Sequence, residues 1–177
     1  MDRAIKEKMI HTINVKKANG KDIHGDVNYY TDGQVVSKPI DGILQFNQSN
    51  VDTDTVVVES LDGVTTYTAG DDYTVLAYGI ELTDESSITE NDTLVVTFKY
   101  STVKSYKCLI LATNKQIKSV SGENIVPSGK VIVDTTEPII ADDEIYTSDN
   151  QIQNKKILGV RYLYNPTMEL DCVILYI

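Results

Sequence analysis

Residues 107–146, KCLILATNKQIKSVSGENIVPSGKVIVDTTEPIIADDEIY, decide the fold. Apolar residues gather at 108–111 and again in the β-branched run 130–134, and a polar segment that contains glycine separates the two runs. Short apolar and β-branched runs bounded by Ser-Gly and proline are typical of β-strands. The stretch therefore predicts a strand, a hairpin-like excursion and a second strand. None of its patterns is typical of a nucleophile, a metal cluster or a phosphate-binding loop.

The rest of the chain repeats this pattern of strands and turns. Residues 10–16 alternate apolar and polar side chains with a period of two, as a half-buried strand does. Apolar runs at 155–162 and 171–177 predict two further strands, and Asn19-Gly20 predicts a tight turn after the first strand. Residues 1–9 predict a short helix. We therefore expect a mainly β protein with a small antiparallel β-barrel or sandwich core and a short N-terminal helix or arm.

Acidic residues are concentrated in one part of the chain. The 177 residues carry a formal net charge of −10, and residues 44–103 contribute eleven acidic side chains and one lysine, which already give −10. Five short strand patterns separated by turns lie in the same window, which is typical of a small antiparallel sandwich or barrel. We predict an inserted acidic β-sandwich-like subdomain at 44–103, and a β-barrel core made of residues 1–43 and 104–177.

Composition argues against several classes of protein. A net charge of −10 does not favour general nucleic-acid affinity, because phosphate binding needs a basic face. No apolar run is long enough to cross a bilayer, so no membrane partner is expected. Residues 1–13 lack the apolar core of a secretory signal. Cys108 and Cys172 each lie in an apolar run, and we expect two buried free thiols in a reducing compartment rather than a disulfide.

The polar residues do not predict catalysis. His11 and His24 have no cysteine or carboxylate at ligand spacing. The acidic segment 52–54 lacks the glycine and glutamate that follow in a calcium loop. The acidic segments 71–72 and 142–144 are typical of turns and of the starts of strands. We expect a protein that is not an enzyme and that uses no cofactor and no metal.

Three stretches carry a resemblance to a known family. They are HTINVK at 11–16 with KDIHGD at 21–26; KCLI at 107–110 with SGENIVPS at 121–128 and DDEI at 142–145; and KILGV at 156–160 with the closing run 171–177. In this order they resemble the head-closure proteins of tailed bacteriophages, also called stoppers or head–tail connectors. The first stretch is similar to that family's opening strand and Asp-x-x-Gly-Asp turn. The second is similar to its strand, its glycine-containing loop and the start of its next strand. The third is similar to its closing strands.

The acidic window departs from this family, whose compact members lack it. TYTAGDDYTV at 66–75, GIEL at 79–82 and DTLVV at 92–96 are similar to the small β-modules of phage tail, sheath and fibre proteins. Both parts of the chain therefore resemble components of a virion.

The resemblance implies a structural protein of the virion that is assembled in the cytoplasm of a bacterial host. It implies a homo-oligomeric ring in the phage neck, between the portal or adaptor and the tail terminator or tail tube. Such a ring completes the head by surrounding the DNA channel and closing it or joining it to the tail. The resemblance also implies that the loop 114–128 faces that channel. There its lysines can contact DNA phosphates without recognising the DNA sequence. The channel-facing residues that it implies are Asn114, Lys115, Lys118, Ser121, Gly122, Glu123 and Asn124.

Other interpretations remain open at this stage. The alternative for the loop 114–128 is a plain hairpin on the outer surface. The whole chain could instead be another tail or baseplate component of a phage, or the acidic part could be a surface module that binds host glycans. A connector is expected to self-assemble, whereas a glycan-binding module is expected to be a monomer that glycan stabilises against heat.

Overall fold

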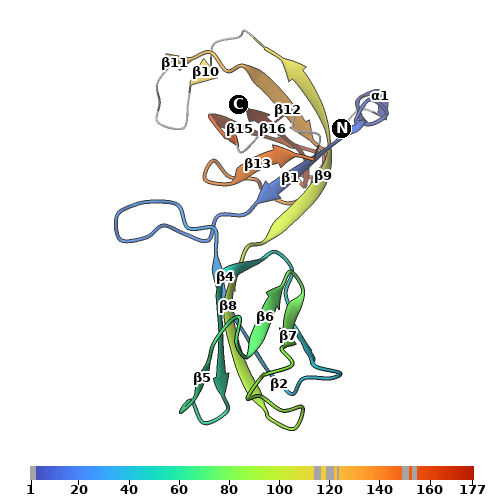
Figure 1. The fold of residues 1–177 in the computed structure, drawn as a ribbon. Helices are drawn as coiled ribbons and strands as arrows, with labels where there is room; N and C mark the ends of the chain where they lie inside the picture. The colour runs from blue at the N-terminus through green and yellow to red at the C-terminus, as the bar shows by residue number, and fades with distance from the viewer. Residues whose placement is uncertain (1–2, 114–116, 119–121, 123, 149–151, 153–154) are drawn as a thin grey trace. The chain divides into compact units, whose positions relative to one another are not determined.

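β-Strands dominate the structure, a computed structural model that describes residues 3–113, 117–118, 122, 124–148, 152 and 155–177. Within these residues, the helix α1 (Arg3–Lys6) is four residues long, and the paired strands run antiparallel (Figure 1). The predicted fold class is confirmed: the protein is mainly β, with a curled antiparallel half-barrel, smaller sheets and a short N-terminal helix.

The chain forms two compact units. Unit 1 comprises Met1–Asn28 together with Val103–Ile177, and unit 2 comprises Tyr29–Thr102. Unit 2 carries thirteen acidic residues and two lysines, a net charge of −11. Unit 2 is therefore a continuous segment placed between two segments of unit 1.

Unit 2 begins earlier than the predicted boundary at residue 44. The strand β2 (Thr31–Ser37) pairs along its whole length with β8 (Leu94–Tyr100), from Thr31 opposite Tyr100 to Ser37 opposite Leu94. This pairing draws the chain from Tyr29 onward into unit 2. Since β2 contains a single acidic residue, the charge distribution does not mark it as part of the acidic unit.

Unit 1 is built on one seven-stranded sheet of order β14-β13-β1-β9-β12-β16-β15 and a separate pair, β10-β11. The strands of unit 1 are β1 (His11–Lys16), β9 (Val103–Ala112), β10 (Ile117–Lys118), β11 (Asn124–Ile125), β12 (Gly129–Val133), β13 (Glu144–Thr147), β14 (Lys155–Lys156), β15 (Gly159–Tyr164) and β16 (Leu170–Tyr176). The predicted strands at 108–111 and 130–134 lie in the neighbouring strands β9 and β12, with Val131 opposite Ile110.

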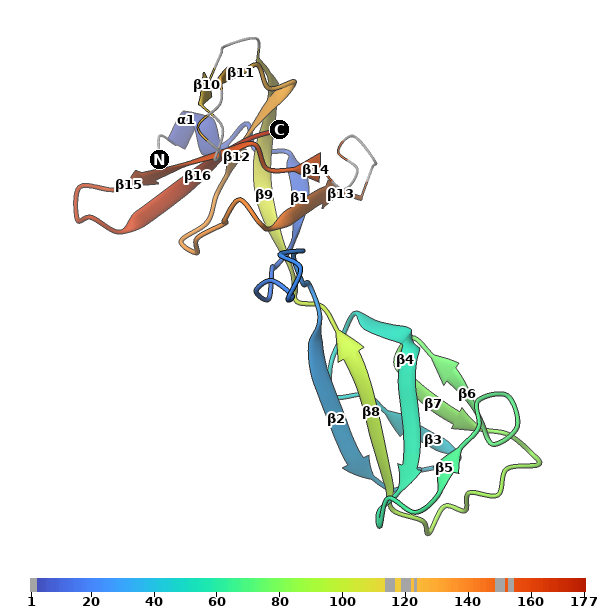
Figure 2. The ribbon, with the colours of Figure 1, turned by 90° about the vertical axis from the view of Figure 1, so that its left-hand side faces the viewer.

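The seven-stranded sheet has to curl, because its two end strands are joined by a very short link. β14 and β15 lie at opposite ends of the strand order, yet Ile157 and Leu158 alone separate them. Three Cα–Cα steps of about 3.8 Å join the two strands, so their facing ends lie at most about 11 Å apart. Figures 1 and 2 show the resulting curl. The prediction of one strand at 155–162 is wrong, because the structure has two strands there, β14 and β15. Between them the chain passes from one end of the sheet to the other, and Ile157 is buried in the core at this point.

The inner face of the curled sheet holds the core of unit 1. Alternate side chains of each strand point inward, as the buried Ile13 and Val15 of β1 and Val131 and Val133 of β12 show. Fully burying such a side chain contributes about 1.5–3 kcal/mol. The core residues are Ile13, Val15, Cys108, Val131, Val133, Ile139, Ile145, Ile152, Ile157, Val173, Leu175 and Ile177. Cys108 and Cys172 are both buried thiols that form no disulfide, as predicted, and burial raises the pKa of the Cys172 thiol.

Unit 2 has its own core between a four-stranded sheet, β2-β8-β4-β5, and a three-stranded sheet, β3-β7-β6 (Figure 2). The strands not yet named are β3 (Ile43–Gln45), β4 (Val51–Ser60), β5 (Thr66–Tyr67), β6 (Tyr73–Leu76) and β7 (Gly79–Leu82). The buried core residues are Leu44, Val58, Tyr73, Ile80, Ile88, Leu94, Val96 and Phe98. The rings of Phe46 and Phe98 lie with their centroids 4.8 Å apart, which adds an aromatic contact to this core.

Candidate functional site

The loop that the sequence singled out is a hairpin with its own pair of strands. In the two-stranded sheet β10-β11, Ile117 lies opposite Ile125 and Lys118 opposite Asn124. Gly122 has a φ of 87°, which glycine adopts without steric cost, and it lies in the bend between the two strands. Figures 1 and 2 show this hairpin at the end of β9 and β12, beside the C-terminus.

The structure describes three of the predicted channel-facing residues, and it brings two of them, Lys118 and Asn124, opposite one another on the paired backbones. Gly122 lies at the bend between them. The remaining four, Asn114, Lys115, Ser121 and Glu123, lie outside the described residues. The channel-facing role of the loop stays a prediction.

The base of the hairpin is fixed against the end of the chain. The backbones of Gly129 and Ile177 exchange two hydrogen bonds, each 3.1 Å long. The hydroxyl of Ser128 donates a third hydrogen bond, 3.0 Å long, to the carbonyl oxygen of Ile177. A Cβ atom on Gly129 would lie 3.3 Å from Cγ1 of Ile177, so a larger residue would press on the closing strand. The hairpin therefore starts from a firmly held point.

The acidic segment 142–144 forms a structural anchor rather than a pair of exposed carboxylates. Asp143 is buried, and its carboxylate accepts hydrogen bonds from the backbone amides of Ala18, at 2.9 Å, and Ile140, at 3.1 Å. The ammonium group of Lys17 donates to the same carboxylate at 3.0 Å. Its interpretation as the turn that starts a strand is confirmed, because β13 begins at the next residue.

The other acidic pair, 71–72, also organises a turn. One carboxylate oxygen of Asp72 accepts the amide of Thr68 at 2.9 Å, and the other accepts the amide and the hydroxyl of Ser87 at 3.0 and 2.6 Å. The Ser87 hydroxyl and then these backbone amides lower the pKa of Asp72, because they stabilise its charged form. The predicted role of this pair as a turn is confirmed.

The segment 52–54, which carries half of a calcium-loop pattern, lies at an irregularity in β4. The pairing of β4 with β8 shifts register between Asp52 and Val57. Asp52 Oδ1 accepts the amide of Asp54 at 3.3 Å, and the Asp52 carbonyl oxygen accepts the Thr55 hydroxyl at 2.7 Å. These two hydrogen bonds lie within the irregular segment and hold its backbone together. Across the described part of the chain, no three or more His, Cys, Asp or Glu side chains gather as a metal-binding group.

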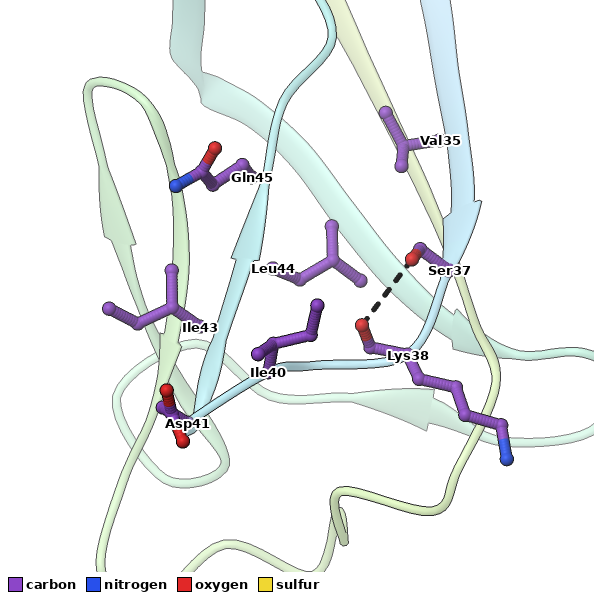
Figure 3. Close-up of a pocket in the computed structure, with 8 residues that line it drawn as sticks. All are labelled: Val35, Ser37, Lys38, Ile40, Asp41, Ile43, Leu44 and Gln45. Atoms are coloured by element: carbon purple, nitrogen blue, oxygen red, sulfur yellow. Dashed lines mark hydrogen bonds between the residues drawn. The ribbon is translucent and has the colours of Figure 1, made fainter.

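Unit 2 contains a hollow where β2 turns into β3 (Figure 3). Its volume is about 450 Å³, and it is lined by Val35, Ser37, Lys38, Ile40, Asp41, Ile43, Leu44 and Gln45. The turn at its edge is tight, because Ile40 and Ile43 exchange backbone hydrogen bonds of 2.8 and 3.0 Å around Asp41 and Gly42. These two central residues have φ angles of 52° and 75°, as a type I′ turn requires. This tight turn forms one edge of the hollow.

A hydrogen-bonded loop of unit 1, residues 17–28, follows β1 directly, and we call it the finger. The backbones of Asn19 and Asn28 join the two sides of the finger at its base, and Lys21 pairs with Val27 further along. At the tip, the carboxylate of Asp22 accepts hydrogen bonds from the amides of His24 and Asp26, both 2.9 Å long. This ordered tip leaves the side chain of Ile23 95% exposed.

Sequence reasoning missed both the hollow and the exposed isoleucine. The sequence does mark the turn beside the hollow, because Asp41-Gly42 is a recognised signal of a tight turn after the strand candidate 34–37. The hollow itself requires β2 to pair with β8 and β3 with β7, and these pairings join residues far apart in the chain. The exposure of Ile23 has no sequence signal, because isolated apolar residues in turns are common.

Comparisons with known proteins give no relative from which a function can be transferred. No protein-family model matches the chain, and no curated protein matches it in sequence. Within the residues that the structure describes, no helix has the length and apolar character to cross a membrane.

Proposed function

We propose that the protein is a non-catalytic structural component of the neck of a tailed bacteriophage. In this proposal it forms a homo-oligomeric ring in the virion, between the portal or adaptor and the tail, and the ring surrounds the DNA channel. The loop 114–128 faces the channel and helps to close it until the tail is joined. The second candidate is another structural component of a phage tail or baseplate.

The observation that carries this proposal is the polar hairpin on a fixed base. The β10-β11 pair extends from between β9 and β12, two neighbouring strands of the curled sheet, while its base is bonded to Ile177. In this proposal the hairpin is displaced about its base, where Ser128 and Gly129 bond to Ile177. This is what a loop that closes a channel and later opens it requires, and the motifs on both sides of the loop resemble the head-closure family.

The organisation of unit 2 supports the same proposal. The chain leaves unit 1 after Asn28 and returns at Val103, and the buried residues of unit 2 form a cluster of their own. An inserted unit with its own core can be added to a ring-forming protein without rebuilding the barrel core. The net charge of −11 on this unit also keeps neighbouring copies from aggregating through its strand edges.

Antibody labelling of tailed particles produced from the encoding genome tests the proposal. A purified antibody against the full chain is expected to label the head–tail junction in electron micrographs. Particles that lack the protein, made by a nonsense mutation in its gene, serve as the control. Label along the tail or at the baseplate would favour the second candidate, and particles without label would contradict both.

The assembly state of the purified full chain gives an independent test. Sedimentation and negative-stain microscopy are expected to show closed rings of one size, or oligomers that grow with protein concentration. A strict monomer that glycans of the host surface stabilise against heat would instead support the glycan-binding module, since a bound ligand raises the melting temperature.

A further inference from the structure

Two buried apolar side chains of unit 1 belong to neither core cluster of the described residues. Met9 is 7% exposed and Cys172 is 2% exposed, yet both lie outside the two clusters. Val173, the next residue of β16 after Cys172, is part of the core of unit 1. Because successive side chains of a strand point to opposite faces, Cys172 lies on the outer face of the curled sheet. Part of the chain on that outer face therefore covers its thiol.

The N-terminal segment, residues 3–9, reaches this place. The ammonium nitrogen of Lys6 lies 3.1 Å from Oδ1 of Asp134. The antiparallel register of β12 and β16, continued by one residue, places Asp134 opposite Cys172. Burial raises the pKa of the Cys172 thiol, and the charges of Asp134 and Lys6 also act on it. Lys6 therefore lies close to the covered thiol.

The same segment crosses the outer face of the sheet. Ile10 leads directly into β1, whereas Asp134 follows β12, and β9 lies between these two strands. The chain from Lys6 to Met9 therefore passes over β9, and Figure 1 shows α1 outside the curl. The burial of Met9 outside the core clusters is explained if its side chain packs on this outer face, beside Cys172.

This segment is held more weakly than the strands beneath it. Residues 3–9 join no strand, and α1 has only four residues, too few for a helix to be stable by itself. The side chains of Lys6 and Asp134 are 45% and 34% exposed, so their ion pair contributes little stability. Segments held in this way open locally while the rest of the protein stays folded.

We propose that residues 3–9 form a strap that opens by itself, and that its opening exposes the thiol of Cys172 while the core stays folded. Cys108, which is fully buried in the core on the inner face, is exposed only when unit 1 unfolds. A group attached to Cys172 has no room beneath the closed strap, so its attachment holds the strap open. The state of one thiol thus controls the position of the N-terminal segment.

Labelling of the full chain with N-ethylmaleimide, followed by peptide mass spectrometry, tests the strap. Cys172 is expected to react well before Cys108, whose labelling reports unfolding in the same sample. Met9→Ala is expected to speed the labelling of Cys172 by about tenfold or more, because it removes the burial of one methionine from the closed strap. Lys6→Ala is expected to speed it by about two- to fivefold, because it removes the ion pair.

Lys6→Ala also separates strap opening from a direct effect of charge on the thiol. Burial raises the pKa of the Cys172 thiol and the charge of Lys6 opposes this rise, so loss of the charge alone would slow a reaction that needs the thiolate. Faster labelling therefore reports opening. The matched control is Lys104→Ala, which removes an ion pair with Glu137 of similar exposure elsewhere in unit 1 and is expected to leave the labelling rate unchanged.

Trypsin tests whether the thiol controls the strap. Protein labelled at Cys172 is expected to be cut after Lys6 and Lys8 several times faster than unlabelled protein, and Cys172→Ser treated with the same reagent is expected to show no change. Equal labelling rates for Cys172 and Cys108, or a Lys6→Ala variant that labels no faster than the wild type, would overturn the strap. Equal cleavage before and after labelling would overturn its control by the thiol. These results do not depend on assembly, so they leave the proposed ring untouched.

Discussion

The ammonium nitrogen of Lys17 lies 3.0 Å from Oδ2 of Asp143, and the Asp143 side chain is 1% exposed. The two residues are far apart in the chain, yet the contact joins the segment after β1 to the turn that precedes β13. The amides of Ala18 and Ile140 donate to the same carboxylate, so this buried charge is fully compensated. One carboxylate thus fixes both the start of the finger and the start of an inner strand.

Replacing Asp143 with alanine is expected to destabilise the protein by about 3–5 kcal/mol, because it leaves Lys17 without its counterion and the amides of Ala18 and Ile140 without their acceptor. Urea denaturation of the full chain measures this loss. The matched control is Lys21→Ala, which removes an exposed ion pair with Asp142 at 3.4 Å and is expected to cost less than about 1 kcal/mol. Equal losses for the two variants would show that the buried carboxylate does not act as an anchor.

The lowered pKa of Asp72 predicts a pH dependence of stability. A carboxyl group whose pKa is lower in the folded than in the unfolded protein stabilises the fold above the ordinary value of 3.8. This contribution is lost as the pH falls below 3.8 and passes through the folded pKa. Asp72→Asn is therefore expected to be less stable than the wild type at neutral pH, and the difference is expected to vanish in acid.

Thermal unfolding of the wild type and Asp72→Asn between neutral pH and pH 3 measures this effect. Asp71→Asn is the matched control, because it makes the same charge change beside the turn, outside the contacts that the Asp72 carboxylate makes with Thr68 and Ser87. A stability difference for Asp72→Asn that does not change with pH would show that the hydrogen-bonded carboxylate is not its source.

Deleting residues 29–102 and joining Asn28 to Val103 through a short Gly-Ser linker is expected to leave unit 1 folded. The core cluster of unit 1 contains residues from outside the deleted segment only. The matched comparison deletes 44–103, which leaves β2 without its partner β8 and exposes an unpaired strand. Circular dichroism is expected to show a cooperative thermal transition for the first deletion and a lower or absent transition for the second. Loss of the transition in both would mean that the two units depend on one another to fold.

Local patterns of the sequence predicted most of the strands. They did not predict which unit β2 belongs to or the break at Ile157, because both depend on contacts between residues far apart in the chain. Alternating and β-branched runs correctly marked β9, β12 and β16, and the polar excursion between β9 and β12 is a hairpin as expected. Charge marked most of unit 2 but not β2, because the strand belongs there through backbone pairing rather than composition. The sequence pattern placed Ile157 in the middle of one strand. In the structure its side chain is buried in the core, at the break between β14 and β15.

The candidate site was accessible to sequence reasoning only in part. The loop 114–128 could be chosen because it is polar and lies between two apolar runs. The hollow beside Ile40 depends on how β2 and β3 are placed by their separate partners, β8 and β7. The conformation of the finger's tip depends on hydrogen bonds from two backbone amides to one carboxylate, that of Asp22, and composition does not reveal them.

Shortening the polar hairpin is expected to separate folding from function. Replacing residues 115–125 with Asn-Gly keeps Ser128 and Gly129, whose bonds to Ile177 fix the base of the hairpin. The removed segment is mostly polar, so the free energy of unfolding is expected to change by only about 1 kcal/mol. Under the proposed function, the shortened protein still enters particles, but these particles lose DNA before tails attach, because the channel is less well closed. Packaged DNA that resists nuclease measures the leak.

A full-length control, Lys115→Gln with Lys118→Gln, keeps the size of the loop and removes its two cations. If the loop closes the channel by its bulk, this control retains DNA; if it holds DNA through phosphates, the control leaks as the shortened protein does. Particles that mature normally with the shortened hairpin would show that the loop is a plain connection on the surface. Failure of the shortened protein to enter particles, with its fold intact in solution, would instead place the hairpin between neighbouring subunits and contradict a role in the channel.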